Sequence, residues 1–271
     1  MQSKSYSLPD ILSRLNIDAL NDMQTTSIAT NEQHSNVVLL SATGSGKTLA
    51  FLLPILDLLD PQNKKTQALI VVPSRELAMQ IEKVFKSLGT WYKVTCCYGG
   101  HLRETEENNL LQPPALLIGT PGRLGDHIRR GNITVDTIET LVLDEFDKTL
   151  ESGFYEEVAF IISSLPALNK RILTSATEAD EIPDFIGLEN PVKLNFLSAT
   201  DELPEGLAIK LVQSDEKDKL KTLFKLICYL GNRSTVVFCN HRESVERTSA
   251  YLTEQTITNV FYHGAMEQQE R

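Results

Sequence analysis

Eight consecutive residues near the start of the sequence have the composition of a phosphate-binding loop. They follow an apolar run, open a helical pattern and combine glycines with a lysine and a threonine: Ser41, Ala42, Thr43, Gly44, Ser45, Gly46, Lys47 and Thr48. Glycines let backbone N–H groups curl around phosphates, and the start of the next helix adds the positive end of its dipole. We expect Lys47 to contact the β- and γ-phosphates of a nucleotide and Thr48 to coordinate Mg²⁺. Ser41 stands where the general pattern has glycine. Serine fits that position unless the backbone there must adopt a positive φ.

A second run with chemical potential is acidic. Asp144 and Glu145 directly follow an apolar run, and open α/β sheets bind ligands at the carboxyl ends of their strands. Asp144 would hold Mg²⁺, and Glu145 would orient or deprotonate an attacking water. Because acidic residues also begin many helices, the pair gains its meaning from the loop about 100 residues upstream.

The hydrophobic pattern predicts the elements that position these residues. Six short apolar runs, rich in Val, Ile and Leu, predict buried parallel strands at 37–40, 68–72, 94–98, 115–118, 141–143 and 171–174. A helical pattern lies between two of them, over 76–88, with apolar residues at steps of four, four and three. This alternation is typical of βαβ units and predicts an α/β fold, a doubly wound and mostly parallel sheet.

The second half of the sequence predicts a change of domain. We expect a first domain over 1–198, a polar linker over 199–206 and a second α/β domain over 207–271. The pattern there predicts strands at 207–212, 235–239 and 259–263, and helices at 215–230 and 244–254. About 65 residues is little for a complete α/β domain, so we expect this domain to be incomplete.

Composition excludes several classes of protein. The 271 residues include 36 acidic and 26 basic side chains, a net charge of −10, which argues against a basic surface that coats nucleic acid but allows a local basic groove. The cysteines Cys96, Cys97, Cys228 and Cys239 lack the spacing of a zinc site, so we expect reduced thiols in a cytosolic protein. The sequence shows neither a secretory signal nor an apolar stretch long enough to span a bilayer, so we expect no membrane association.

Further motifs, taken in order, resemble those of the DEAD-box RNA helicases of helicase superfamily two. The set comprises PSRELA at 73–78, Gly99-Gly100, TPGR at 120–123, DEFD at 144–147, Gly153-Phe154, SAT at 175–177, VFCN at 237–240, and His263-Gly264 with Gln268 and Arg271. The resemblance covers nearly the whole chain. No single motif is decisive, but their order is specific.

The resemblance implies two RecA-like domains, the second incomplete, that hydrolyse ATP with Mg²⁺ and remodel short RNA duplexes in the cytoplasm. It implies an adenine-reading segment over 1–27 that ends near Gln24. It implies RNA contacts that do not depend on base sequence, from residues that would bind the backbone: Arg75, Gly100, Thr120, Gly122 and Arg123. It implies coupling of the two activities by Asp147, Ser175 and Thr177.

Three departures from the family pattern bear on these expectations. Phe146 replaces the alanine of the acidic motif, so we expect a bulky ring beside the metal site to repack its neighbours. Gln24 lacks the usual Pro-Thr before it, and Tyr6 is a weak substitute for the upstream aromatic that stacks on adenine. The chain ends before the motifs that carry the arginine fingers, so we expect a truncated protein with weak nucleotide binding and almost no hydrolysis.

Two alternatives remain open at this point. A DNA helicase or translocase of the same superfamily would have a similar loop and acidic motif, and the comparison of RNA-stimulated with DNA-stimulated hydrolysis would separate the two. A non-catalytic, ATP-dependent RNA clamp is the other, although the intact Lys47 and Glu145 argue against a dead site.

Overall fold

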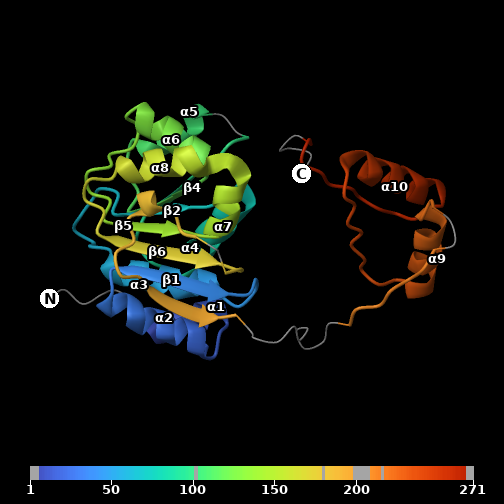
Figure 1. The fold of residues 1–271 in the computed structure, drawn as a ribbon, viewed down its shortest axis with the longest axis horizontal. Coiled ribbons are helices and arrows are strands. Elements are labelled where there is room, and N and C mark those ends of the chain that lie inside the picture. Colours follow the sequence, from blue (N-terminus) through green and yellow to red (C-terminus); the bar gives the residue numbers. More distant parts are fainter. Residues whose placement is uncertain (1–5, 101–102, 179–180, 198–207, 215–216, 267–271) are drawn as a thin grey trace. The chain divides into compact units, whose positions relative to one another are not determined.

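The computed structural model describes residues 6–100, 103–178, 181–197, 208–214 and 217–266. The chain divides into two compact units, Met1–Asp201 and Glu202–Arg271. The first unit contains the sheet (Figure 1). Among the described residues it also holds nearly all of the buried apolar side chains. The predicted linker at 199–206 lies outside the described residues, as do residues 1–5, Gln268 and Arg271.

A seven-stranded sheet with the spatial order β3-β4-β2-β5-β6-β1-β7 forms the centre of the first unit. The strands, in chain order, are β1 (Asn36–Ser41), β2 (Ala68–Val71), β3 (Val94–Cys97), β4 (Leu116–Gly119), β5 (Thr140–Leu143), β6 (Lys170–Ser175) and β7 (Val192–Phe196). Every neighbouring pair is parallel, so all carboxyl ends lie along one edge of the sheet.

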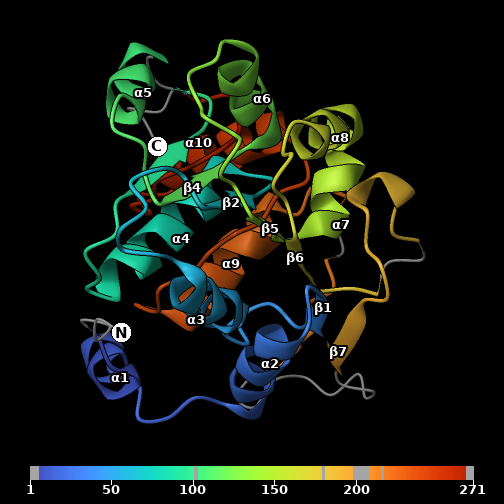
Figure 2. The same cartoon turned by 90° about the vertical axis from the view of Figure 1, so that its left-hand side faces the viewer.

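Helices cover both faces of this sheet (Figure 2). They are α1 (Leu8–Leu15), α2 (Asp22–Gln33), α3 (Lys47–Leu58), α4 (Arg75–Ser87), α5 (Arg103–Leu110), α6 (Pro121–Arg129), α7 (Phe146–Thr149) and α8 (Tyr155–Ser163). A π-helical turn spans Leu150–Phe154 and a 3-10 turn spans Asp184–Ile186. Short polar caps start several helices; at α4, for example, the Ser74 hydroxyl accepts a hydrogen bond from Leu77 N at 3.2 Å.

The alternation of side chains along each strand divides the core into two layers. On β2, Ala68 and Ile70 join a cluster with α1, α3 and α4, whereas Leu69 and Val71 join a cluster with α6, α7 and α8. Both faces of the central strands are therefore buried, which explains why their sequences are apolar without alternation.

The six strands predicted for the first unit and the predicted helix at 76–88 are confirmed to within two residues at each end. The pattern missed β7, an edge strand that pairs with β1 and alternates between half-buried and exposed residues. Its signal is the alternation of Val192, Leu194 and Phe196, which differs from the continuous apolar runs of the buried strands.

The described residues of the second unit form two helices, α9 (Leu220–Leu230) and α10 (Arg242–Glu254). α10 matches its predicted range to within two residues, whereas α9 begins five residues later than predicted. The strands predicted at 207–212, 235–239 and 259–263 are wrong for the described residues, which form no strand there. Phe238 and Val260 are 94% and 96% exposed. An apolar run suits a strand, but a strand also needs a neighbouring strand to share its backbone hydrogen bonds. Within the predicted strand at 259–263, the Asn259 side chain instead bonds to α10 and accepts from Ser249 Oγ at 2.6 Å.

Among the described residues, no helix combines the length and the apolar character that crossing a bilayer requires.

Lys170, at the start of β6, connects two elements of the first unit. It is 6% exposed and donates hydrogen bonds to the carbonyls of Asn31 at 2.6 Å and His34 at 2.7 Å. It thereby ties the end of α2 to the sheet, and its burial lowers the pKa of its ammonium group.

Candidate nucleotide-binding site and the neighbouring strand ends

The loop between β1 and α3 has the backbone of an anion-binding turn. Gly44 and Gly46 have φ values of +82° and +93°, in the left-handed region that favours glycine. Ser41 is the last residue of β1 and does not have a positive φ, so serine fits its position. Its hydroxyl donates to Ser45 Oγ at 2.8 Å, while Ala42 and Thr43 are exposed. A glycine turn of this kind directly before the first turn of a helix is typical of a phosphate-binding site.

Lys47 lies across the loop that precedes it. Its ammonium group donates to the carbonyl of Ala42 at 2.9 Å and to the carbonyl of Ser41. Burial lowers the pKa of Lys47, and the carboxylates of Asp144 and Glu145 act in the opposite direction. The lysine, the loop and the acidic pair therefore share one electrostatic environment.

Asp144 follows β5 directly and is 4% exposed. Burial raises its pKa to about 6, with a smaller contribution from Glu145, whereas the hydroxyl of Thr174 and the charge of Lys47 oppose the rise. Its Oδ1 accepts hydrogen bonds from Thr174 Oγ1 and from Glu145 N. Among the described residues its Oδ2 accepts none, so one carboxylate oxygen remains for a cation.

Glu145 has an unusual backbone. Its φ of +49° and ψ of 50° place a non-glycine residue in the left-handed region, immediately before α7. Its carboxylate pairs with Lys148 Nζ at 3.0 Å, and its carbonyl accepts from Thr149 N at 3.0 Å. Strained residues of this kind concentrate at functional sites.

The rest of the acidic motif divides between the core and the next strand end. The ring of Phe146 is 1% exposed and packs in the cluster formed by α6, α7 and α8 with the sheet. Asp147 Oδ2 accepts from Thr177 Oγ1 at 2.7 Å, and Ser175 Oγ accepts from Thr177 N at 2.9 Å. The end of β6 is thus joined to the residues after β5.

Thr174 is a residue of this site that the sequence analysis missed. It is fully buried on β6, one residue before the predicted SAT motif, and its hydroxyl contacts both members of the acidic pair. A buried threonine beside a motif is a weak signal in a sequence, because β-branched residues are common in strands.

Gln24 reaches the loop from α2. Its Oε1 accepts from Asn21 N at 3.0 Å in a capping box, and its Nε2 donates to Gly46 O at 3.2 Å. Asn21 adds a hydrogen bond from its Nδ2 to Ser45 O at 3.0 Å. Tyr6 contacts a different part of the fold, since its hydroxyl donates to Leu56 O at 2.8 Å, near the far end of α3. At about 1.5 Å per residue, Leu56 is about 13 Å along the helix from Lys47.

The predicted RNA contacts follow three other strand ends. Arg75 begins α4 after β2 and pairs with Glu76 at 2.8 Å. Gly100 follows β3 with a φ of +104°, and Thr120 and Gly122 follow β4, where Gly122 is open to solvent. Arg123, in the first turn of α6, pairs with Glu106 at 3.3 Å.

Glu106 is the centre of a buried polar cluster beneath these residues. It is 1% exposed; its Oε1 accepts from Tyr98 N at 2.8 Å, and its Oε2 lies 2.7 Å from His127 Nε2. Cys97 adds a thiol, and the possible ligand atoms of Cys97, Glu106 and His127 lie within 4.8 Å of one another. His127 Nδ1 accepts from Asn132 at 3.1 Å, and Arg123 pairs with the Glu106 carboxylate. The hydrogen bonds and the charge of the cluster are therefore satisfied by its own neighbours and do not require a metal.

The sheet order sorts all these segments into two adjacent groups along the carboxyl edge. The ends of β3, β4 and β2 contain the Gly-Gly, TPGR and PSREL segments, and the ends of β5, β6 and β1 contain the acidic motif, the SAT motif and the loop. At about 4.8 Å per strand, the six ends span about 24 Å. A nucleotide site and a second, elongated site can therefore lie side by side.

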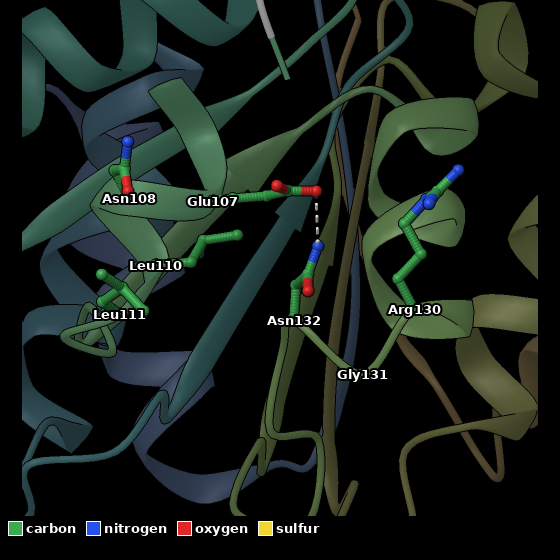
Figure 3. Close-up of a pocket in the computed structure, with 7 residues that line it drawn as sticks. All are labelled: Glu107, Asn108, Leu110, Leu111, Arg130, Gly131 and Asn132. Carbon is green, nitrogen blue, oxygen red and sulfur yellow. Dashed lines mark hydrogen bonds between the residues drawn. The ribbon is translucent and has the colours of Figure 1, made fainter. Parts of the chain in front are cut away.

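A hollow of about 650 Å³ lies away from this edge, between α5 and the segment that follows α6 (Figure 3). Its lining includes Leu110, Arg130 and Asn132, and the Asn132 amide donates to Glu107 Oε1 at 3.3 Å. The segment lies at the end of α6, and α6 begins at the carboxyl edge, so the hollow is not part of the candidate site.

Comparisons with known proteins agree with this arrangement. The family model of the DEAD/DEAH box helicase matches residues 21–185. An ATP-dependent RNA helicase eIF4A of Emericella nidulans is 35% identical over 243 residues, which are 88% of this chain and 61% of that protein. A eukaryotic initiation factor 4A of Caenorhabditis elegans is 34% identical, over 87% of this chain and 60% of its own length.

The fold gives the same answer as the sequence. A crystal structure of a DEAD box protein from the hyperthermophile Methanococcus jannaschii matches with a TM-score of 0.66 and 25% identity, over 99% of this chain and 73% of that one. The chain spans about three fifths of the length of the curated relatives named above. The family match covers more than half of the chain and includes the loop, the acidic motif and the SAT motif. The chain therefore belongs to the DEAD/DEAH box helicase family.

Proposed function

We propose that this chain acts in an ATP-dependent RNA helicase that remodels short duplexes. The observation that carries the proposal is the order of the motifs along the carboxyl edge, with the nucleotide-binding segments on β5, β6 and β1 and the proposed RNA contacts on β3, β4 and β2. The names of the eIF4A relatives support ATP and RNA as the ligands.

ATP would be bound by the loop from Ser41 to Thr48, with Lys47 at its β- and γ-phosphates. Gln24 would bind adenine, because its amide retains one N–H and one lone pair beyond the hydrogen bonds to Asn21 and Gly46. We propose separately that Gln24 selects adenine over other bases, since the side chain already has a second role in capping α2.

Mg²⁺ fits the oxygen ligands at this site. The Oδ2 of Asp144 and the hydroxyl of Thr48 have no hydrogen-bond partner among the described residues. Both are hard oxygen ligands of the kind Mg²⁺ prefers, and the ion would offset the cost of burying the Asp144 charge. When bound, magnesium neutralises developing charge on the phosphates. Glu145 would hold the attacking water and accept its proton.

RNA would lie along the other three strand ends. Arg75 and Arg123 offer guanidinium groups, and Gly100 and Gly122 allow the backbone to approach closely, while Thr120 offers a hydroxyl. Such groups bind phosphate and ribose without reading bases, so we propose contacts that do not depend on sequence. The Asp147–Thr177 hydrogen bond, with Ser175, would couple the nucleotide-binding segments to the proposed RNA contacts.

The wider organisation is also part of the proposal. We propose a first domain over 1–198, a linker over 199–206 and a second domain over 207–271, supported by the boundary between the two compact units near residue 201. We propose a cytoplasmic location, supported by the initiation-factor name of a relative.

The decisive experiment measures magnesium-nucleotide and nucleic-acid binding on residues 1–271. A fluorescent ADP analogue should bind to the wild type and not to Lys47→Ala, whereas Lys83→Ala, an exposed lysine on α4, is the matched control. Single-stranded RNA should bind more tightly than DNA of the same sequence. Equal binding of the two would favour a DNA-directed enzyme, and nucleotide binding without hydrolysis in a longer chain would favour a clamp.

A further inference from the structure

Thr174 occupies a position between the two halves of the nucleotide site. It lies on β6, which pairs with β5 on one side and with β1 on the other, and it is opposite Leu39 of β1. The register pairs Leu143 with Leu173, so Thr174 stands beside Asp144, the next residue after β5. Its position follows from the sheet, because strands fix side chains more closely than loops do.

The hydroxyl of Thr174 makes two hydrogen bonds of opposite direction. It donates to Asp144 Oδ1 and accepts from Glu145 N at 3.3 Å. A hydroxyl has one proton, so the donation to the carboxylate fixes its orientation and directs a lone pair at the N–H group. The residue is fully buried, so water does not replace either bond.

These bonds determine where the acidic pair points. Donation to Oδ1 leaves Oδ2 of Asp144 without a hydrogen bond among the described residues. Acceptance from Glu145 N holds the strained turn, with its φ of +49°, that directs the glutamate. The hydroxyl therefore selects the carboxylate oxygen that is available to a cation and anchors the backbone of the neighbouring residue.

We propose that Thr174 is a positioning residue for magnesium at the nucleotide site, and that it acts through Asp144. This inference rests on the proposed ATP site. It predicts that loss of the hydroxyl weakens the magnesium-dependent part of nucleotide binding and leaves the magnesium-free part intact. A residue that only fills space would change neither part selectively.

The experiment titrates a fluorescent ADP analogue into residues 1–271 with Mg²⁺ and with EDTA. In Thr174→Val, which keeps the shape, the gain in affinity from Mg²⁺ should fall by about tenfold or more, because the bond is to a charged group. Affinity in EDTA should stay within about twofold. Thr174→Ser keeps the hydroxyl and should retain the gain, and Thr140→Val, a buried threonine at the other end of β5, is the matched control.

The outcomes separate the two proposals. If the wild type binds no nucleotide, the ATP site is wrong and this inference falls with it. If the wild type binds with a gain from Mg²⁺ that Thr174→Val retains, the inference alone is overturned. Equal losses with Mg²⁺ and with EDTA would assign Thr174 a structural role and would also overturn it. Thermal melting of each variant identifies any loss caused by unfolding.

Discussion

Replacement of Asp144 by asparagine should change the stability of the first unit in a manner that depends on pH. Burial raises the pKa of Asp144 from an ordinary value of 3.8 to about 6. The folded chain therefore holds this proton more tightly than the unfolded chain between these pH values. The contribution of Asp144 to stability is greatest below pH 3.8, falls as the pH rises to about 6, and is constant above that.

The expected magnitude follows from the same difference. The pKa of Asp144 differs by about two units between the folded and unfolded chain, and one pKa unit is about 1.4 kcal/mol. Ionised Asp144 therefore lowers the free energy of unfolding by about 3 kcal/mol at neutral pH. Asparagine has no charge to bury, but its new N–H₂ group needs a hydrogen-bond acceptor. A buried N–H₂ group without an acceptor costs about 1–3 kcal/mol at every pH. The diagnostic quantity is therefore the change with pH. The free energy of unfolding of Asp144→Asn minus that of the wild type should rise by about 2–3 kcal/mol between pH 4 and pH 7.5.

Urea unfolding in EDTA, followed by circular dichroism, measures this quantity. Asp136→Asn, at an exposed carboxylate, is the matched control for a loss of one charge. A difference between variant and wild type that stays constant over this pH range would refute the reasoning. With Mg²⁺ and ADP the wild type should gain more stability than Asp144→Asn, because binding stabilises the folded state and the variant lacks the metal ligand.

Four further outcomes test other parts of the structure. Lys47→Ala should abolish magnesium-nucleotide binding in titration calorimetry without a lower melting temperature, since within the described residues the Lys47 side chain donates hydrogen bonds to its own loop alone. An unchanged affinity would contradict the loop assignment. Phe146→Ala should lower the free energy of unfolding by about 3–5 kcal/mol, measured in urea, because its ring is 1% exposed. Glu106→Gln should weaken single-stranded RNA binding in fluorescence anisotropy and leave nucleotide affinity unchanged, because the carboxylate pairs with Arg123. For the wild type, the logarithm of RNA affinity should fall with the logarithm of salt concentration and be insensitive to base sequence.

Prediction from the sequence succeeded where local pattern and tertiary context agree. The strands of the first unit are apolar because both sheet faces are covered, so their burial is visible in their composition. The loop and the acidic pair were placed at strand ends for the same reason, since each directly follows such a run. The order of the strands in space is not visible in the same way, and it is this order that separates the motifs into two groups.

The failures have physical causes too. The edge strand β7 is half-buried on one face and exposed on the other, so its composition differs from that of the central strands. The apolar runs of the second unit, such as the one that contains Phe238, have strand composition without a paired neighbour in the described residues. Thr174 is invisible because its role depends on a register between β5 and β6 that no local pattern encodes.

The left-handed backbone of Glu145 has a consequence for how this chain would change under selection. A non-glycine residue at a φ of +49° costs about 1 kcal/mol relative to an ordinary conformation, and glycine adopts that φ without the penalty. A library screened only for resistance to heat has no reason to retain the glutamate, whereas a screen for turnover does. The two screens should therefore diverge at this position, and a heat-tolerant descendant with glycine there would be folded and chemically silent.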